Sequence, residues 1–340
     1  MEHLYGYTEK GEEFIFDRKT VTMPHALVIG KAGTGKTQMI QQEIVSNLLT
    51  GDENDKIIVV DENGEYKDFA KKHGGEIVNF TDTFINPCDL PLNSSQKIVM
   101  ADFLISFSEI ILGKECNAVQ KAIISKAVSS MYSMYMYEVI KTDRPIKREE
   151  CPTLASFYDK LSCYSEREID KLLIAIEPYC KGMFDCFANR TNVNLDCRLI
   201  VIDLSSINIR RMALALHVTL MFLWSVLIEN NSYSENTWIY FEDFHRYFKN
   251  PILTDTFLQI FKRARTKGGI ITGITQQANI PYPVLHTIEN LILLSQSKNN
   301  AELLKETYYI PDNLMKYITE KPQYVGLMQF NGGEFIPFTK

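Results

Sequence analysis

Nine short runs of β-branched, aliphatic or aromatic residues are spread along the chain. Most are continuously apolar rather than alternating, and helical patterns separate several of them. Continuous runs are typical of parallel strands buried on both faces of a sheet, because crossover helices cover each face. The pattern therefore predicts an α/β fold with a mostly parallel sheet. Its strands are Ala26 to Ile29, Ile57 to Asp61, Glu76 to Phe80, Leu199 to Leu204, Trp238 to Phe241, Ile270 to Thr275, Leu291 to Leu294, Tyr324 to Gln329 and Phe335 to Phe338.

The last two predicted strands flank Asn331-Gly332-Gly333-Glu334, so a terminal hairpin is predicted there. A different segment, Met212 to Ile228, is almost wholly apolar but contains only 17 residues, with His217 among them. A bilayer requires roughly 20. This segment lies between two predicted strands, where a parallel sheet needs a crossover helix, so a buried helix is favoured over a membrane span.

Between about Ser95 and Arg190 the apolar positions recur with helical spacing, and no strand signal is present. Helices are predicted over Lys97 to Leu112, Ala118 to Ile140 and Glu166 to Tyr179. We interpret this stretch as an all-α insertion. It divides the chain into a first part of the core (residues 1–94), the insertion (residues 95–190) and a second part of the core (residues 191–340).

Composition narrows the class of protein only slightly. The 340 residues are 45% hydrophobic and 23% charged, and the net charge of −6 gives the whole chain no electrostatic footprint for nucleic acid. Local basic clusters occur at Lys141 to Arg148 and at Arg263 to Lys267. Seven scattered cysteines fit reduced thiols in a cytosolic protein better than a disulfide framework or a zinc site. The first residues lack the basic and apolar regions of a signal peptide.

The predicted strand Ala26 to Ile29 runs directly into a glycine-rich loop. Residues 30 to 37 read Gly-Lys-Ala-Gly-Thr-Gly-Lys-Thr, which is the P-loop pattern, and a helical pattern follows at Gln38 to Leu49. Glycines let backbone N–H groups turn around nucleotide phosphates, while Lys36 is suited to the β and γ phosphates and the Thr37 hydroxyl to Mg²⁺. The sequence thus predicts a site for ATP and Mg²⁺ formed by Gly30, Lys31, Ala32, Gly33, Thr34, Gly35, Lys36, Thr37 and Gln38.

An acidic pair ends the predicted strand Trp238 to Phe241. A P-loop enzyme needs one carboxylate in the Mg²⁺ shell and another beside the attacking water. Here the order is Glu242-Asp243, where Asp-Glu is commoner, and the two side chains differ in length by about 1.5 Å. We assign Glu242 to the metal together with Thr37, and Asp243 to the water. The alternative is a buried strand that simply ends in two solvated acids.

Two further candidates flank the predicted strand Ile270 to Thr275. Gln276 follows it, where a side-chain amide could sense the γ-phosphate or orient water. Arg265 precedes it, where a guanidinium is suited to a neighbouring subunit's nucleotide, because an arginine added in trans stabilises transition-state charge. Taken singly, such residues are more often surface or loop residues, and it is their order within one chain that favours catalytic roles.

These residues together resemble the ATPase domain of conjugal-transfer and type IV secretion ATPases of the TraC/TraE/TrbE type, in the HerA/FtsK group of RecA-like P-loop motors. Asp61-Glu62-Asn63-Gly64-Glu65-Tyr66 is similar to the family's Asp-Pro-Glu-x-Glu-Tyr, although Glu62-Asn63 replaces Pro-Glu. Arg265 matches an arginine of an Arg-Lys pair, but Thr266 replaces the lysine. Other matching stretches are Gly6 to Arg18, Ile85 to Asp89, Pro152 to Leu154, Phe241 to His245 and Gly273 to Gln276.

The resemblance implies a RecA-like core and ATP hydrolysis that powers a conjugative type IV secretion apparatus. It further implies hexamers, a secretion channel and coupling components as partners, and a cytoplasmic location at the inner face of the cell membrane through them. Such proteins usually carry a large N-terminal domain, and this chain begins just before the ATPase core, as a fragment or excised domain would. Two alternatives stay open: a nucleotide-binding scaffold with little turnover, favoured by the reversed acidic pair, and a HerA/FtsK-like DNA translocase.

Overall fold

One large sheet organises the molecule. The computed structural model describes residues 3–89, 94–142, 148–229, 236–285, 287–320 and 325–339. Within these ranges eleven strands form a single sheet in the order β2-β1-β11-β10-β9-β3-β8-β7-β4-β6-β5. The strands are β1 (His3–Thr8), β2 (Glu13–Phe16), β3 (Ala26–Ile29), β4 (Lys56–Asp61), β5 (Glu76–Val78), β6 (Leu199–Asp203), β7 (Thr237–Phe241), β8 (Gly269–Thr275), β9 (Asn290–Leu294), β10 (Val325–Gln329) and β11 (Ile336–Thr339).

The seven strands from β9 to β5 are parallel, and β10, β11, β1 and β2 add to them antiparallel, so the predicted mostly parallel sheet is confirmed. All nine predicted strands are present, and β10 and β11 form the predicted hairpin. Strand β5 ends at Val78 rather than Phe80, because Phe80 has a left-handed φ of 56°. Tyr324 of the predicted β10 lies outside the described residues.

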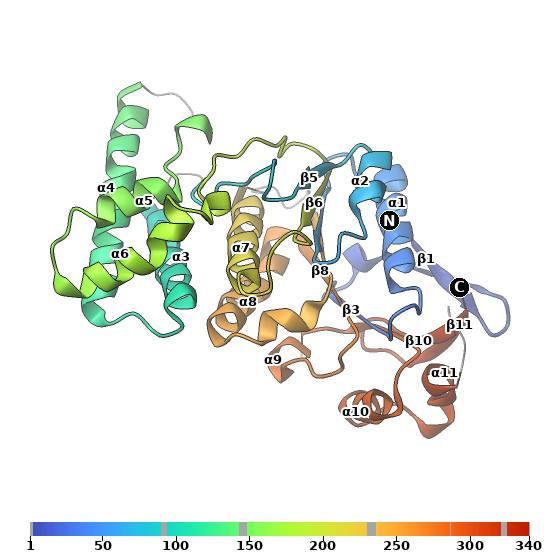
Figure 1. Ribbon diagram of the computed structural model, residues 1–340. Helices are drawn as coiled ribbons and strands as arrows, with labels where there is room; N and C mark the ends of the chain where they lie inside the picture. The colour runs from blue at the N-terminus through green and yellow to red at the C-terminus, as the bar shows by residue number, and fades with distance from the viewer. Residues whose placement is uncertain are drawn as a thin grey trace.

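Helices cover both faces of the parallel part of the sheet, which explains its continuous apolar runs. Alternate residues along β4 belong to two separate cores: Ile57 and Val59 pack on the side of α1 (Lys36–Thr50) and α2 (Lys67–Lys72), and Ile58 and Val60 on the opposite side. There α7 (Met212–Glu229) and α8 (Pro251–Ala264) form the covering layer (Figure 1). Each fully buried aliphatic side chain of this kind contributes about 1.5–3 kcal/mol.

The apolar segment predicted as a crossover helix is α7, which connects β6 to β7 and is almost entirely buried. Among the described helices, none combines the length and hydropathy needed to span a membrane. The remaining helices of the core, α9 (Tyr282–Leu285), α10 (Lys298–Tyr308) and α11 (Lys316–Thr319), follow β8 and β9. All seven cysteines are described, and none forms a disulfide.

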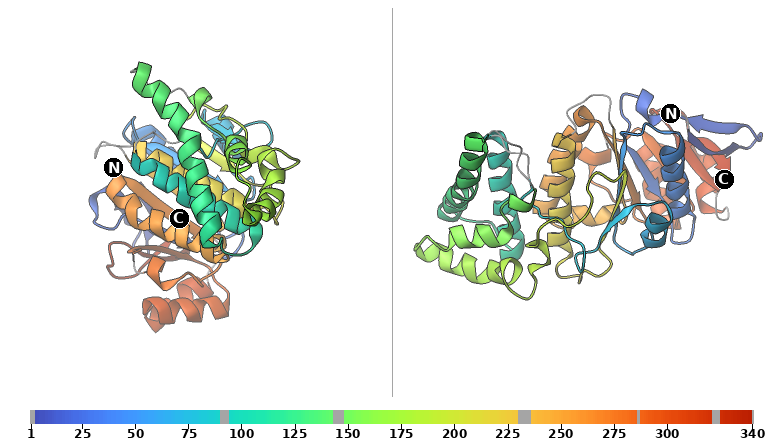
Figure 2. Two further views of the ribbon diagram at one scale, coloured as in Figure 1. Left: turned by 90° about the vertical axis from the view of Figure 1, so that its left-hand side faces the viewer. Right: turned by 90° about the horizontal axis from the view of Figure 1, so that it is seen from above.

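The helical insertion lies on the far side of α7 and α8 from the sheet (Figures 1 and 2). It contains α3 (Ser94–Leu112), α4 (Ala118–Thr142), α5 (Leu154–Leu161) and α6 (Arg167–Cys180), and its described residues form no strand. At its junction with the core, the His217 ring of α7 stacks on Phe103 of α3 with centroids 4.8 Å apart. The all-α insertion is therefore confirmed, while its limits at residues 95 and 190 stay a prediction.

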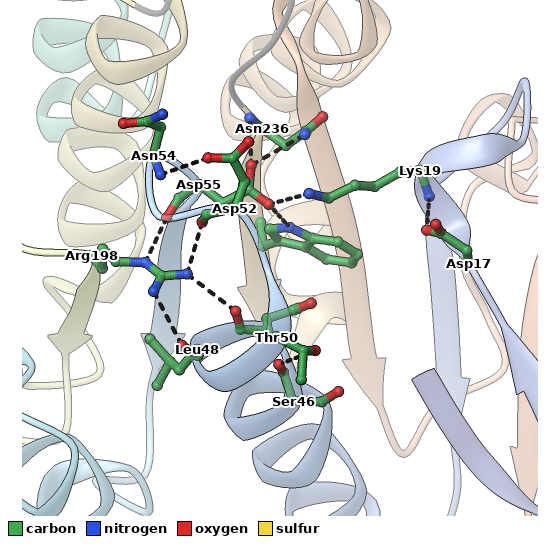
Figure 3. A network of polar contacts seen from close by, with 12 residues as sticks. Asp17, Lys19, Ser46, Leu48, Thr50, Asp52, Asn54, Asp55, Arg198 and Asn236 are labelled. Carbon is green, nitrogen blue, oxygen red and sulfur yellow. Dashed lines mark hydrogen bonds and ion pairs between the residues drawn. The ribbon is translucent and has the colours of Figure 1, made fainter. Parts of the chain in front are cut away.

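Helix α1 is held near its middle and at its C-terminus. Near its middle, buried Glu43 accepts hydrogen bonds from Tyr5 (2.8 Å) in β1 and from Arg18 (3.0 Å), which also donates to Thr272 of β8 (2.9 Å). At its C-terminus the Arg198 guanidinium donates to four backbone carbonyls, at 3.1 Å to residues 47 and 48, 2.9 Å to residue 52 and 3.4 Å to residue 55 (Figure 3). These contacts fix the helix whose N-terminus carries the P-loop.

Candidate functional site

The P-loop connects β3 to α1 at the carboxyl edge of the parallel strands. Gly33 and Gly35 have φ angles of 75° and 95°, in the left-handed region that favours glycine. Gly30 is required for a different reason: a Cβ there would lie 2.6 Å from Thr34 Oγ1 and 2.9 Å from Leu294 Cβ. The first glycine therefore permits close packing of the loop against β9, and the other two permit its turn.

The Lys36 ammonium lies inside the loop. It donates to the carbonyls of Gly30 (2.8 Å) and Lys31 (2.9 Å), and burial lowers its pKa. The N–H groups of Gly30 and Lys31 already donate to the carbonyls of Thr275, the last residue of β8, and Ser295, which directly follows β9. The sequence predicted that these two residues bind phosphate. In the structure their N–H groups are bonded within the protein, and their carbonyls accept hydrogen bonds from Lys36.

The acidic pair follows β7 beside the end of β4. Glu242 is 7% exposed and accepts a hydrogen bond from the Tyr66 hydroxyl at 3.0 Å, and burial raises its pKa to about 8. Asp243 adopts a left-handed φ of 46°. Aspartate tolerates this conformation better than most residues other than glycine and asparagine do. Its carboxylate accepts from the Asn63 amide at 3.3 Å. Both carboxylates therefore have defined positions opposite the P-loop.

A third carboxylate was not identified from the sequence. The Thr37 hydroxyl donates to Glu65 at 2.6 Å, so Glu65 lies at the hydroxyl that we assigned to Mg²⁺. Glu65 and Asn63 belong to the turn after β4, and β4 pairs with β7. The sequence signal was the acidic turn directly after a buried strand, which we had used only for the resemblance and not for a role in the site.

One cavity of about 410 Å³ joins these groups. It is lined by Ala32, Gly33, Gly35, Lys36, Thr37, Gln38, Asn63, Glu65, Glu242, Asp243, Ile274, Thr275 and Gln276. The structure thus brings most of the predicted site residues together. Thr34 is not on the cavity wall, because its hydroxyl donates to the Lys31 carbonyl at 2.8 Å. Gln276 is on the wall, and its backbone carbonyl accepts from Asn300 at 2.9 Å.

Arg265 is not near this cavity. It lies in the short helix η5 (Arg265–Lys267) at the start of β8, whereas Gln276 follows the end of the same strand. A seven-residue strand separates the two positions by about 23 Å at 3.3 Å per residue. Arg265 contacts Met23 at 3.4 Å and is exposed. The guanidinium therefore cannot reach the cavity of its own subunit.

The residues present fit a nucleoside triphosphate with Mg²⁺. The wall combines a left-handed glycine loop, an ammonium and a hydroxyl next to carboxylates, which are oxygen donors that Mg²⁺ prefers. Among the described residues, no cluster of three or more acidic, histidine or cysteine side chains could hold a metal alone. This is expected for Mg²⁺ held by one or two carboxylates and substrate phosphates. Fold and site together define a RecA-like P-loop fold with a cavity that suits a nucleoside triphosphate.

Comparison with known proteins places the chain in a family. Residues 6–223 match the family described as Helicase HerA, central domain. Because the match covers more than half of the chain, the chain belongs to this family. The HerA/FtsK group inferred from the sequence is thereby confirmed. None of the curated proteins matches the chain.

Solved structures share the whole fold. VirB4 of Thermoanaerobacter pseudethanolicus has a TM-score of 0.82 and 17% sequence identity, over 99% of this chain and 96% of VirB4. The bacterial conjugative coupling protein TrwBdeltaN70, in an unbound form, has a TM-score of 0.65 and 12% identity, over 100% and 89% of the two chains. The plasmid coupling protein TrwB in complex with ADP and Mg²⁺ gives a TM-score of 0.64 and 12% identity, over 100% and 90%. The RecA-like P-loop fold is confirmed.

Proposed function

We propose that this chain is an ATP-hydrolysing motor domain that powers a conjugative type IV secretion apparatus. The observation that carries the proposal is one cavity that joins the Lys36 ammonium, the Thr37 hydroxyl and a carboxylate pair. The similarity over the full chain to VirB4, and to TrwB bound to ADP and Mg²⁺, supports the same nucleotide and the same setting. The working form is a hexamer at the cytoplasmic face of the membrane, joined to the channel and coupling components, with DNA or protein as its load.

Each residue has a distinct task in this proposal. Lys36 leaves the carbonyls of Gly30 and Lys31 and binds the β and γ phosphates. Thr37 and Glu242 hold Mg²⁺, which supplies positive charge to the phosphates when bound. Asp243 accepts a proton from the water that attacks the γ-phosphorus while the bond to the bridging oxygen breaks, releasing ADP.

Two predicted roles concern the surroundings of the reaction. Gln276, on the cavity wall, senses the γ-phosphate through its side-chain amide. Arg265, about 23 Å along β8 from that wall, acts on the nucleotide of a neighbouring subunit. An arginine contributed in trans makes turnover depend on assembly, as a ring-shaped motor requires.

The test is the rate of phosphate release by wild type and by Lys36→Ala, with Lys31→Ala as the matched control. Both lysines lie in the P-loop, but the Lys31 side chain is exposed. We expect Lys36→Ala to reduce turnover about 100-fold or more while the protein stays folded, because the lost charge stabilises the transition state. Lys31→Ala should retain most of the activity. A folded Lys36→Ala protein with full turnover would falsify the site.

The same assay separates the alternative functions. It is run with no DNA, with single-stranded DNA and with double-stranded DNA, and the solution mass is measured alongside. Nucleotide binding without turnover in the wild type would identify a scaffold instead. Strong stimulation by double-stranded DNA would identify a HerA-like translocase. Of the two basic clusters that could serve such a load, Lys141 to Arg148 falls largely outside the described residues.

A further inference from the structure

A second carboxylate lies directly beside Asp243. Strands β4 and β7 are parallel, and their register pairs Val60 with Phe241. Two residues further along each strand, the chain reaches Glu62 and Asp243, so these two acids lie side by side where the strands end. Like charges at this spacing repel each other unless a cation lies between them.

Arg246 is that cation. Its Nε lies 2.9 Å from Glu62 Oε2 and 3.9 Å from Asp243 Oδ2. It belongs to the short helix η4 (Phe244–Phe248) that follows the acidic pair, and its backbone N–H donates to the Asp243 carbonyl at 2.8 Å. Arg246 is therefore tied to Asp243 through the backbone and faces it through the side chain.

The Glu62 side chain is deeply buried but makes few polar contacts among the described residues. It is 1% exposed, and Arg246 is its sole ion-pair partner within 4 Å among the described residues. Neither of its carboxylate oxygens has a hydrogen-bond partner with good geometry in the described part of the chain, and the same holds for the buried Tyr247 hydroxyl. A buried ion pair with few hydrogen bonds is weak evidence for a stabilising role, because desolvation offsets most of its attraction. Such a pair calls for another explanation.

We infer that Arg246, anchored by Glu62, is a positioning residue for Asp243, the residue proposed to accept the proton of the attacking water. Glu62 holds the guanidinium at one side, and the guanidinium separates the two carboxylates. Asp243, 15% exposed and held by Asn63, is thereby kept on the cavity wall without a close ion pair that would occupy its oxygens. This inference rests on the proposed function.

The arrangement predicts an unusual pattern of mutant effects. In Arg246→Gln the two carboxylates repel each other and Asp243 shifts. In Glu62→Gln the guanidinium is released from Glu62 and closes on Asp243, which is then occupied. We expect each substitution to lower kcat for ATP about tenfold or more, since small displacements of a reacting group have effects of this size. The double variant lacks both the repulsion and the released cation, so its kcat should exceed that of either single variant at least threefold.

The experiment measures kcat, KM for ATP and the thermal midpoint of all three variants at pH 9, where Glu62 is ionised because burial raises its pKa only to about 8. Arg167→Gln is the charge-matched control. Arg167 is exposed at the start of α6 in the insertion. The KM should change less than twofold, because neither Glu62 nor Arg246 lines the cavity. Arg246→Lys should recover part of kcat, since it keeps the charge. If Arg246→Gln does not fold, Arg246→Lys and Glu62→Gln still give the test.

The outcomes are distinct. Unchanged kcat in the single variants, or a double variant whose loss is the product of the two single losses, would overturn the positioning role. Variants with lower thermal midpoints but wild-type kcat would show a purely structural pair. A raised KM with unchanged kcat would show that Arg246 contacts the nucleotide directly. Failure of the proposed function looks different, because wild type would then be as inactive as Lys36→Ala.

Discussion

Replacing Arg198 tests how the C-terminus of the P-loop helix is held. Arg198 precedes β6, and its guanidinium donates to four carbonyls around the end of α1 (Figure 3). The carbonyls of residues 47 and 52 also accept from the backbone N–H groups of residues 51 (3.0 Å) and 55 (3.1 Å), so the guanidinium is a second donor to them. A cation at a helix C-terminus also interacts favourably with the helix dipole. We expect Arg198→Gln to lower the free energy of unfolding while leaving nucleotide affinity unchanged at temperatures where the protein is folded.

The size of the effect follows from these contacts. Three of the bonds are 2.9–3.1 Å long, and each contributes about 1 kcal/mol, because water reaches this partly exposed site and replaces part of the interaction. The favourable charge at the helix end adds about 0.5 kcal/mol. The expected loss is therefore about 3 to 4 kcal/mol. Arg198→Lys keeps the charge but not the planar fork of donors, so it should lose about 2 to 3 kcal/mol.

The assay is urea-induced unfolding followed by circular dichroism. Arg167→Gln, which removes an exposed arginine from the insertion, serves as control and should stay within about 0.5 kcal/mol of wild type. A loss below about 1 kcal/mol in Arg198→Gln would refute the reasoning, since water would then satisfy the carbonyls as well as the guanidinium does.

Three further predictions concern the candidate site. Asp243→Asn should reduce turnover but spare ATP binding, whereas Glu242→Gln should weaken the Mg²⁺ dependence of ATP binding measured by titration calorimetry. If the two substitutions have identical effects on binding and on turnover, the roles of the two carboxylates are assigned wrongly. The specific activity of wild type should rise with protein concentration, and Arg265→Ala should flatten that rise. A wild-type monomer with full turnover at every concentration would exclude the role of Arg265 in trans. Burial raises the pKa of Glu62 to about 8 from its ordinary 4.5, so the unfolded state binds fewer protons between these values and stability falls as pH rises through them. From pH 6.5 to 8 Glu62 alone lowers the unfolding free energy by at most about 2 kcal/mol, and urea titrations of Glu62→Gln should lack this part of the decline.

The parallel strands could be predicted from sequence because helices cover both of their faces, which leaves continuous apolar runs. Strands β1 and β2 were not predicted. In β2 the side chains alternate between exposed and half-buried, and β1 carries an irregularity between Leu4 and Gly6, so neither gives a clear periodic signal. The place of β1 in the sheet is determined by the distant strand β11, and β2 joins the sheet through β1.

Some residues of the candidate site could be predicted from sequence and others could not. The P-loop and the acidic pair are continuous in sequence, so their chemistry was visible as motifs. Asn63 and Asp243 lie 180 positions apart. They meet only through the β4–β7 register, and the same register brings Glu62 and Arg246 together. For Gly30 the motif indicated a role in phosphate binding. It did not reveal that a side chain at this position would collide with Leu294.

The pairing of β1 with β11 has a consequence for the growing chain. Tyr7 pairs with Thr339, so the inner neighbour of the first strand is the last strand described. At about 5–20 residues per second, the intervening chain takes roughly 15 to 65 s to synthesise. During that interval the inner edge of β1 has no partner in the sheet, and an unpaired strand edge is a template for pairing with other chains. The nascent protein must therefore keep this edge from such pairing until β11 has been synthesised.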